Sequence, residues 1–456
     1  MDAPEVSTSP QRAICTHYAS SMTTQRRVDE VSRSRLEALG LDYRLVTDDD
    51  AAIDAWCAAC ARGFHDVAPE AEDSRREIRR ERARAQRVLG AWKASQEGEP
   101  IATVCSWPME LTIAPGRSLS MWGISGVTVA PTHSGKGIAR AMLEGELRSA
   151  AAEGYAIAGL TVSESTLYGR YGFGISAQSS ILRFDTTRVN WCGPTPDVEL
   201  DFITVAEAVE VLQRLHSKQA RATRCDVVRE ATFWRLVTGV ETPNDATVRS
   251  RRFVLATSPA GDELGIVGYR LDGFDDDDFT KHRLIVDVLV APDIDGRAAL
   301  WRYVLSQPLV RSVKTEQLVA PDDPIRWWIG DWRGVQERRT DHHWTRVLDV
   351  VRVLEACAYS APDRLVLEIE DDLGFAEGMY LLDTRDQQPV VTRCDGATPG
   401  VAHIKLDVST LASLVFGCFS AESLGAAAQL EGDDASVRCA GSLFQTGREP
   451  FLSTWF

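Results

Sequence analysis

A glycine-bearing loop at residues 133–140 has the composition of a phosphate-binding site. It follows a predicted strand, 121–130, and opens a predicted helix, 137–152. The first turn of a helix presents unpaired N–H groups and the positive end of the helix dipole, which together bind phosphate. Gly135 and Gly137 remove Cβ atoms where a diphosphate would approach the backbone. We therefore predict that a phosphorylated cosubstrate binds here.

Two familiar nucleotide motifs do not fit this loop. A Walker loop requires Ser or Thr directly after its Gly-Lys pair, and here Gly137 follows Lys136. A dinucleotide fingerprint requires a third glycine at the position held by Arg140. Lys136 or Arg140 can instead add positive charge, and Ala139 keeps the first helical turn small. Taken alone, the loop remains compatible with a glycine turn that binds nothing.

A second segment with possible chemistry follows the next predicted strand. Ser163 and Glu164 stand at the end of that strand, and a Tyr-Gly-Arg-Tyr-Gly-Phe-Gly run begins at Tyr168. A phenol with a pKa near about 10 is protonated at neutral pH, so Tyr168 can donate a proton to a leaving group. The alternative is a tyrosine that packs in an aromatic–glycine turn. We assign Tyr171 and Phe173 to packing.

The segments that position these residues alternate between strands and helices, as in an α/β domain. The patterns predict a strand at 43–46, helices at 49–61 and 73–89, and strands at 90–94, 100–112 and 156–162. The glycine loop therefore stands inside a β–loop–α–β unit.

The same strand, Ala-Pro corner and helix recur later in the chain. Residues 127–131 read Val-Thr-Val-Ala-Pro, and residues 288–292 read Val-Leu-Val-Ala-Pro before a helix predicted at 298–304. This order indicates an internal duplication. The second loop contains Asp293 and Asp295, whose charges would repel a phosphate. We predict a second domain of the same fold without a cofactor site.

The two ends of the chain differ in character. A third, α+β region follows a Trp-rich, charged stretch at 327–344, with helices predicted at 350–356, 408–415 and 422–430 and strands at 364–370 and 378–383. The apolar cluster at 451–456 is expected to be buried. Residues 1–38 are polar and are interpreted as a disordered arm with a helical end near 28–39, and Met22 is an alternative start.

The composition fits a protein of about three globular domains. The 456 residues are 44% hydrophobic and carry a formal net charge of −16. This charge argues against nucleic acid as a partner and favours cationic substrates. No apolar stretch is long enough to span a membrane, and no signal peptide is recognisable. We expect a cytoplasmic protein without a membrane partner.

Neither the cysteines nor the histidines are spaced as metal ligands. The ten cysteines include one C-x-x-C pair, Cys57 and Cys60, which we interpret as small core residues. Free thiols fit a reducing cytoplasm. His342 and His343 are assigned to the surface or to a domain junction, and no metal is expected. The acidic run at 275–278 is expected to be an exposed turn.

The block at 127–174 closely resembles the enhanced intracellular survival (Eis) acetyltransferases of actinobacteria, which belong to the GNAT superfamily of N-acetyltransferases. The loop fits the superfamily pattern Gln/Arg-x-x-Gly-x-Gly/Ala at Gly137 and Ala139 and departs from it at Ser134. The run that begins at Tyr168 is the more specific match.

The resemblance covers nearly all of the chain beyond the N-terminal arm and implies a mixed α/β fold in three domains. These are a catalytic GNAT domain at 39–190, a degenerate second GNAT-like domain at 191–343, and a sterol-carrier-like α+β domain at 344–456.

The resemblance also implies acetyl-CoA as the cosubstrate. The strand residues would pair with the pantetheine arm and the acetyl carbonyl, the loop would hold the diphosphate, and two residues after the next strand would line the same groove. These residues are Val127, Thr128, Val129, Gly135, Lys136, Gly137, Ile138, Ala139, Arg140, Ser163 and Glu164.

By the same resemblance, Tyr168 is the general acid for the leaving thiolate and the terminal carboxylate of Phe456 is the general base for the amine. An α-carboxyl group with a pKa near about 3.5 is a weak base, but desolvation would raise that pKa. Glu164 is the alternative base if the tail does not reach the site. Asp66, after the first long helix, could pair with a substrate ammonium group or be solvated.

The function expected from the resemblance is acetylation of polycationic small molecules, with aminoglycosides as the family's hallmark and a hexamer as its assembly. Acetylation of protein or peptide lysines is an alternative within the same chemistry. A non-catalytic acyl-CoA or lipid-binding module is an alternative of a different class.

Overall fold

The computed structural model describes residues 27–67, 74–94, 96–272, 278–315, 319–445 and 447–456. They form two compact units: the first contains the described chain up to Trp107 together with Ile124–Tyr155, and the second contains Pro108–Gly123 and Ala156–Phe456. The strands β3 (Ala102–Ala114) and β4 (Arg117–Val129) contribute residues to both units. Of the acidic run predicted as an exposed turn, only Asp278 lies within the described residues.

The first unit places its strands in the order β1-β2-β3-β4, with β1–β2 and β2–β3 antiparallel. Its other elements are α2 (Glu30–Glu37), β1 (Leu41–Leu45), α3 (Asp50–Gly63), α4 (Arg76–Arg84), β2 (Arg87–Lys93), the 3-10 turn η1 (Pro131–His133) and α5 (Ile138–Ala152). The strand–loop–helix order predicted around the glycine loop is confirmed.

The last residues of the N-terminal arm are folded, which corrects the prediction of a disordered arm for residues 27–38. Asp29 caps α2 by accepting a hydrogen bond from the Ser32 N–H at 2.8 Å, and Arg148 of α5 donates to the same carboxylate at 2.7 Å. Leu36 is fully buried. The helical end predicted near 28–39 is confirmed, and residues 1–26 lie outside the described part of the chain.

The helix predicted at 73–89 is wrong at its end. α4 stops at Arg84, and β2 begins at Arg87. Six of the seven β2 residues are buried, because this strand pairs with β1 on one edge and β3 on the other. Central pairing of an apolar run therefore overrides the helical propensity of the charged residues before it.

The second unit continues the sheet in the order β4-β5-β12-β6-β11-β10-β9-β8-β7. These strands are β5 (Ile157–Thr161), β6 (Gly174–Asp185), β7 (Glu199–Ile203), β8 (Arg252–Thr257), β9 (Glu263–Asp272), β10 (His282–Val290), β11 (Val310–Thr315) and β12 (Val335–Val347). β12 lies between β5 and β6 and pairs antiparallel with both. No pattern in the sequence predicts this strand.

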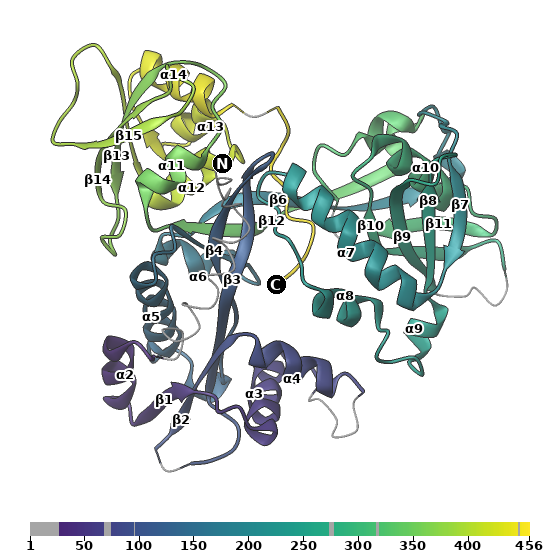
Figure 1. Cartoon of the computed structure of the whole chain (residues 1–456), viewed down its shortest axis with the longest axis horizontal. Coiled ribbons are helices and arrows are strands. Elements are labelled where there is room, and N and C mark those ends of the chain that lie inside the picture. Colours follow the sequence, from purple (N-terminus) through teal and green to yellow (C-terminus); the bar gives the residue numbers. More distant parts are fainter. Residues whose placement is uncertain (1–26, 68–73, 95, 273–277, 316–318, 446) are drawn as a thin grey trace, which may run out of the picture. The chain divides into compact units, whose positions relative to one another are not determined.

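The part of the sheet formed by β8–β11 is covered on both faces. α7 (Val205–Ala222) packs on β9 and β10, and α10 (Ile294–Leu305) packs on the opposite face of the same strands (Figure 1). The helix predicted at 298–304 is thus confirmed, with an earlier start. The remaining helices of this part are α6 (Ser165–Tyr168), α8 (Ala231–Thr238), α9 (Ala246–Ser250) and the 3-10 turns η2 (Gly169–Tyr171), η3 (Thr186–Arg188), η4 (Pro324–Trp328) and η5 (Trp332–Gly334).

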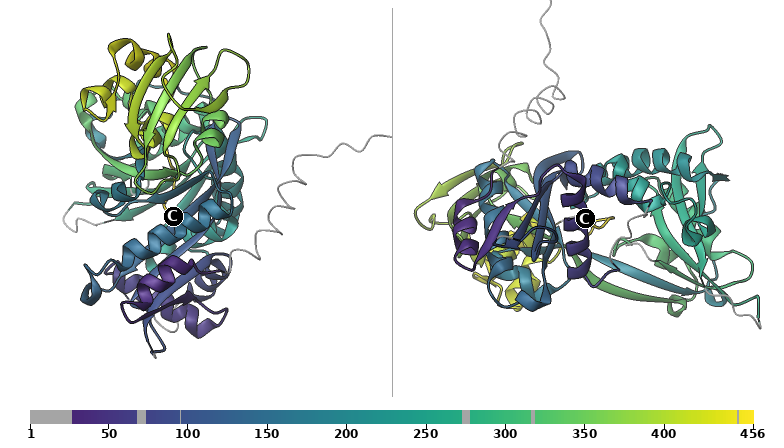
Figure 2. Two further views of the ribbon diagram at one scale, coloured as in Figure 1. Left: turned by 90° about the vertical axis from the view of Figure 1, so that its left-hand side faces the viewer. Right: turned by 90° about the horizontal axis from the view of Figure 1, so that it is seen from below.

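The C-terminal region, coloured green to yellow in Figure 2, contains a second sheet. Its strand order is β15-β14-β13-β16-β17. Its elements are α11 (Val350–Ala356), β13 (Arg364–Glu370), β14 (Gly378–Asp383), β15 (Val390–Cys394), β16 (Ala402–Asp407), α12 (Val408–Phe416), α13 (Ala421–Ala426), β17 (Leu430–Glu431) and α14 (Asp434–Phe444). The helix predicted at 422–430 is wrong at its end, because Leu430 pairs with Leu406 at the sheet edge.

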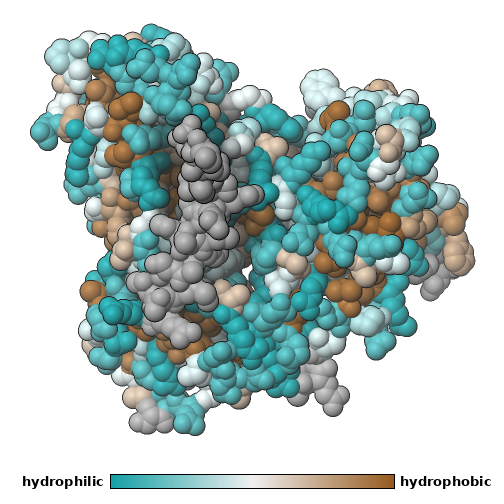
Figure 3. All heavy atoms as spheres, in the orientation of Figure 1, coloured by the Kyte–Doolittle hydropathy of each residue, from teal (hydrophilic) through white to brown (hydrophobic). Residues whose placement is uncertain are grey.

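Polar and charged side chains cover most of the face drawn in Figure 3. Within the described residues, no helix is long and apolar enough to cross a membrane. The described cysteines are unpaired thiols, and Cys57 and Cys60 are partly buried on α3.

Candidate active site

Both glycines of the predicted phosphate loop adopt the left-handed conformation that side chains disfavour. Gly135 and Gly137 have φ values of 77°, and no heavy atom lies within 4 Å of where a Cβ would stand on either residue. Gly137 is the N-cap of α5, and no side chain caps this helix. The first N–H groups of α5 are therefore open to a ligand, in a cradle that fits a diphosphate.

The charges around this loop favour an anion. Lys136 is exposed. The pKa of His133 is lowered by desolvation and by the nearby charges of Lys136 and Lys93. Arg140 is also exposed, but its Nε donates to Glu144 Oε1 at 3.0 Å. Lys136 is thus the cation best placed to contact a bound phosphate.

The strand that leads into the loop is held by close contacts. Thr128 is buried, and its hydroxyl lies 2.6 Å from the Thr103 hydroxyl. A Cβ on Gly63, the last residue of α3, would stand 2.3 Å from the Thr128 Cβ. Val127 and Val129 are half-buried. Gly63 therefore lets α3 close against the strand that the resemblance assigns to the pantetheine arm.

The corresponding helix of the predicted second copy, α10, starts differently. Asp293 caps α10 by accepting hydrogen bonds from the N–H groups of Asp295 at 2.9 Å and Gly296 at 3.2 Å. A Cβ on Gly296 would stand 2.6 Å from the Leu264 carbonyl oxygen. A carboxylate thus occupies the position that a phosphate would need, which confirms that this copy of the loop is degenerate.

In the second unit, Phe456 lies against the end of β5. The Thr161 hydroxyl donates to a Phe456 carboxylate oxygen at 2.5 Å. The Phe456 ring meets the His343 ring edge-on, with centroids 5.5 Å apart. The tail before it is also packed: Phe451 and Leu452 are buried, and Thr454 is 3% exposed. The prediction that the apolar tail is buried is confirmed, although Trp455 is half exposed.

Tyr168, at the end of α6, is buried with its ring edge-on to Phe173 at 6.2 Å. Desolvation raises the pKa of its phenol, and a hydrogen bond with Ser163 offsets part of that rise. Tyr168 is therefore protonated at neutral pH, which is the state a general acid requires.

The turn after Tyr168 is held by the buried ion pair between Arg346 and Asp371. Arg346 Nε donates to the Tyr171 carbonyl oxygen at 2.7 Å, and its Nη2 donates to both Asp371 oxygens at 2.6 and 2.7 Å. Gly172 has a φ of 78°, and a Cβ there would stand 2.7 Å from Arg346 Nε. Tyr171 and Phe173 are both buried.

Of the remaining sequence-predicted residues, Ile138 is buried and Ala139 half-buried in the first turn of α5. Ser163, Glu164 and Asp66 are exposed. Ser163 contacts Tyr168, whereas Glu164 accepts a hydrogen bond from the Thr166 hydroxyl at 3.1 Å. Asp66 follows α3 in a left-handed C-cap: His65 has a φ of 59°, and the Asp66 N–H donates to the Ala61 carbonyl oxygen at 2.9 Å. Its carboxylate is exposed to solvent.

The histidines of β12 are buried, which excludes the surface and leaves a domain junction of the two predicted locations. His342 is 1% exposed and donates from Nε2 to the Thr454 carbonyl oxygen at 3.0 Å. His343 is fully buried, with Nδ1 3.1 Å from Cys225 Sγ. Burial lowers the pKa of His342 to about 4 and that of His343 to about 3, so both rings are neutral.

Sequence reasoning missed four residues that hold the tail: Thr161, His216, Asp226 and His342. Each lies more than 110 positions from its tail partner, so no local pattern could find them. Among the described residues, no group of three His, Cys, Asp or Glu side chains could hold a metal ion.

Comparison with known families assigns most of the chain. The profile of an acetyltransferase (GNAT) domain matches residues 42–176, and that of a second GNAT domain matches residues 225–353. The profile of the sterol carrier protein domain matches residues 350–453. The fold is therefore a mixed α/β arrangement of two GNAT domains and a sterol-carrier-like domain.

Relatives match over most of their length. An uncharacterized N-acetyltransferase of Streptomyces avermitilis is 31% identical over 377 residues, 81% of this chain and 88% of the relative. The N-acetyltransferase Eis of Mycobacterium tuberculosis is 26% identical over 358 residues, 75% and 82% of the two chains. The crystal structure of Eis1 from Mycobacterium abscessus superposes with a TM-score of 0.76 at 25% identity, covering 91% of this chain and 100% of that chain.

Proposed function

Because this chain belongs to the Eis-like family of GNAT N-acetyltransferases, which use acetyl-CoA, we propose that it acetylates amino groups of polycationic small molecules such as aminoglycosides. In this proposal Tyr168 is the general acid and the carboxylate of Phe456 is the general base. The observation that carries it is the hydrogen bond that ties this carboxylate to Thr161, at the end of the strand that leads to Tyr168.

The residues would divide the reaction as follows. The Phe456 carboxylate takes a proton from the attacking amine, directly or through a water molecule, as the new C–N bond forms. Tyr168 gives its proton to the sulfur as the C–S bond breaks. Acetyl-CoA supplies the acetyl group as a thioester and leaves as free CoA thiol. The uncapped start of α5, with Gly135, Lys136 and Gly137, would hold its diphosphate.

The proposed substrate class follows from charge. A net charge of −16 attracts polycations at low ionic strength. The exposed carboxylate of Asp66 is the residue we propose to pair with a substrate ammonium group. Acetylation of protein or peptide lysines remains the second candidate, because a lysine side chain presents the same primary amine.

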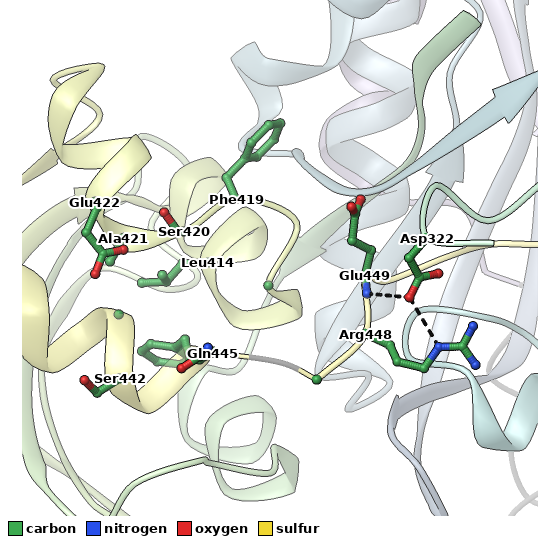
Figure 4. A pocket seen from close by; sticks show the side chains of 14 residues that line it. Asp322, Leu414, Phe419, Ser420, Ala421, Glu422, Ser442, Gln445, Arg448 and Glu449 are labelled. Carbon is green, nitrogen blue, oxygen red and sulfur yellow. Dashed lines mark hydrogen bonds and ion pairs between the residues drawn. The ribbon is translucent and has the colours of Figure 1, made fainter. Parts of the chain in front are cut away.

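A lipid carrier is less well supported by the C-terminal domain. Leu367 and Leu411 lie fully buried in its core. A pocket of about 470 Å³ opens beside α12–α14, but polar side chains such as Glu422 and Gln445 line it together with apolar ones (Figure 4). An ion pair between Arg448 and Asp322 also borders it. An acyl chain requires a mostly apolar cavity.

The test is a thiol-release assay with purified protein, acetyl-CoA, and either kanamycin or a lysine peptide. We expect CoA release with kanamycin. Tyr168→Phe, and a chain extended by Gly-Ser-Gly after Phe456, should each lose at least about 100-fold in kcat, with the KM for acetyl-CoA within about twofold of wild type. Tyr359→Phe is the matched control, since that buried phenol donates to the Leu354 carbonyl oxygen at 2.7 Å.

Full activity in the extended chain would defeat the role of Phe456. Release with the peptide and not with kanamycin would select lysine acetylation. Acetyl-CoA that binds without turnover on either amine would favour the non-catalytic module.

We also propose the domain limits 39–190, 191–343 and 344–456, a cytoplasmic location and, from the family resemblance, a homohexamer. Light scattering of the purified protein would test the assembly.

A further inference from the structure

The last residues of the chain lie on a loop that belongs to the second GNAT-like domain. This loop, residues 223–229, joins α7 to α8. It is anchored to β3 through an N–H···O bond from Cys225 to Thr112 at 2.8 Å and another from Thr112 to Asp226 at 2.9 Å. Cys225 has a φ of 73°, an unusual value for a residue with a side chain. These contacts with β3 hold the loop in a strained conformation independently of its contacts with the tail.

Asp226 is the centre of the contact with the tail. It is fully buried, and its Oδ1 accepts hydrogen bonds from the Ser453 N–H at 3.1 Å and the Ser453 hydroxyl at 3.0 Å. The neighbouring Val227 N–H donates to the same oxygen at 2.9 Å. A carboxylate taken fully out of water is costly unless it is hydrogen-bonded. Two of these bonds join Asp226 to Ser453, and the third, from Val227, holds the carboxylate within its own loop.

Two histidines complete the contact from other directions. His216 on α7 is fully buried, and its Nε2 lies 2.8 Å from Ser453 Oγ. His342 on β12 holds the Thr454 carbonyl oxygen. Ser453 and Thr454, three and two residues before Phe456, are therefore held by the 223–229 loop, α7 and β12.

We propose that the second GNAT-like domain, which has lost its own phosphate site, serves as a clamp that positions the Phe456 carboxylate for catalysis. Asp226, His216 and His342 are the positioning residues of this clamp. The inference rests on the proposed function, in which Phe456 is the general base. It assigns a role to a domain whose helix start is closed by Asp293.

The physical reason is that chain ends fray unless they are tied down. A base displaced by about 1 Å from its productive position can cost about 100-fold in rate. The Thr161 hydrogen bond holds one oxygen of the carboxylate, whereas the clamp fixes the backbone that carries it. Loss of the clamp should therefore lower kcat and leave acetyl-CoA binding intact.

The test compares Asp226→Ala and Ser453→Ala with the conservative variant Asp226→Asn, which keeps the Oδ1 acceptor. A matched control is Asp287→Asn, a buried aspartate of the same domain that pairs with Arg251 and does not touch the tail. Two readouts are used: steady-state kinetics with acetyl-CoA and kanamycin, and release of Phe456 by carboxypeptidase A, followed by mass spectrometry.

We expect Asp226→Ala and Ser453→Ala to lose at least tenfold in kcat with an unchanged KM for acetyl-CoA, and to release Phe456 at least tenfold faster. Asp226→Asn and Asp287→Asn should stay within threefold of wild type in both readouts. Ser453→Ala is the decisive variant if Asp226→Ala does not fold.

Phe456 release at the wild-type rate in Ser453→Ala would overturn the clamp, whatever the activity. Faster release with unchanged kcat would keep the tail contact but overturn its catalytic role. If wild-type protein has no turnover, the proposed function fails, and the release rate still decides whether the clamp exists.

Discussion

Acidification should destabilise this protein before most of its carboxylates are protonated, because three buried histidines are neutral in the folded state. Burial lowers the pKa of His216 and His343 to about 3 and that of His342 to about 4. In the unfolded chain a histidine has a pKa of about 6.5, so that state binds more protons below this pH. Stability therefore falls as the pH falls from about 6.5 toward 4.

Asp226 contributes to the pH dependence of stability with the opposite sign. Burial raises its pKa to about 6, so the folded state holds a proton that the unfolded state has released, and stability rises as the pH falls through 6. Between pH 7 and pH 5, each histidine contributes a loss of about 2 kcal/mol and Asp226 a gain of about 1 kcal/mol. The net loss is about 4 to 5 kcal/mol, a large part of the stability of a typical domain.

Urea unfolding at pH 7 and pH 5, at one ionic strength and followed by circular dichroism, measures this difference. His343→Gln removes one titrating ring and should reduce the pH-dependent loss by about 2 kcal/mol. Asp226→Asn should increase that loss by about 1 kcal/mol. Equal stability of the wild type at the two pH values, or the same pH dependence in His343→Gln, would refute this reasoning.

Three further outcomes follow from local geometry. Gly137→Val should raise the KM for acetyl-CoA about tenfold, and Gly154→Val should leave it unchanged, as steady-state kinetics on both variants would show. The two glycines are matched, because both have φ near 80° and open space around them, at opposite ends of α5. Asp293→Ala should cost about 1 kcal/mol by thermal unfolding and leave the KM for acetyl-CoA unchanged, because it removes only the cap of α10. Asp371→Ala should destabilise by about 3 to 5 kcal/mol, since it leaves Arg346 buried without its carboxylate, and the double variant Arg346→Met with Asp371→Leu should recover most of that loss in urea unfolding.

The sequence predicted best the elements with a clear period and clear boundaries. α5 differs by one residue from the predicted 137–152, and α11 and β13 match their predicted ranges. The loop before α5 could also be predicted, because Gly135 and Gly137 are the residues that a left-handed backbone conformation favours. The burial of the tail followed from its apolar residues alone.

β12 shows why the rest could not be predicted. It carries charged residues along its first half and His342, His343 and Arg346 in its buried half, so it lacks the apolar alternation of a strand. These polar residues are buried because distant partners satisfy them, among them Asp371 for Arg346. The same holds for Asp226, whose partner Ser453 is 227 positions away.

The position of β12 explains how distant segments reach one carboxylate. Its pairing with β5 sets His343 opposite Thr161, so that one register places the residue that bonds Phe456 beside the ring that packs on it. The preceding residue, His342, donates a hydrogen bond to the carbonyl oxygen of Thr454, two residues before the chain end. A shift of this register by one residue would move His342 and His343 each to the other face of the sheet, because side chains alternate along a strand. The strand that completes the sheet therefore also determines where the proposed base lies, and neither role could change without the other.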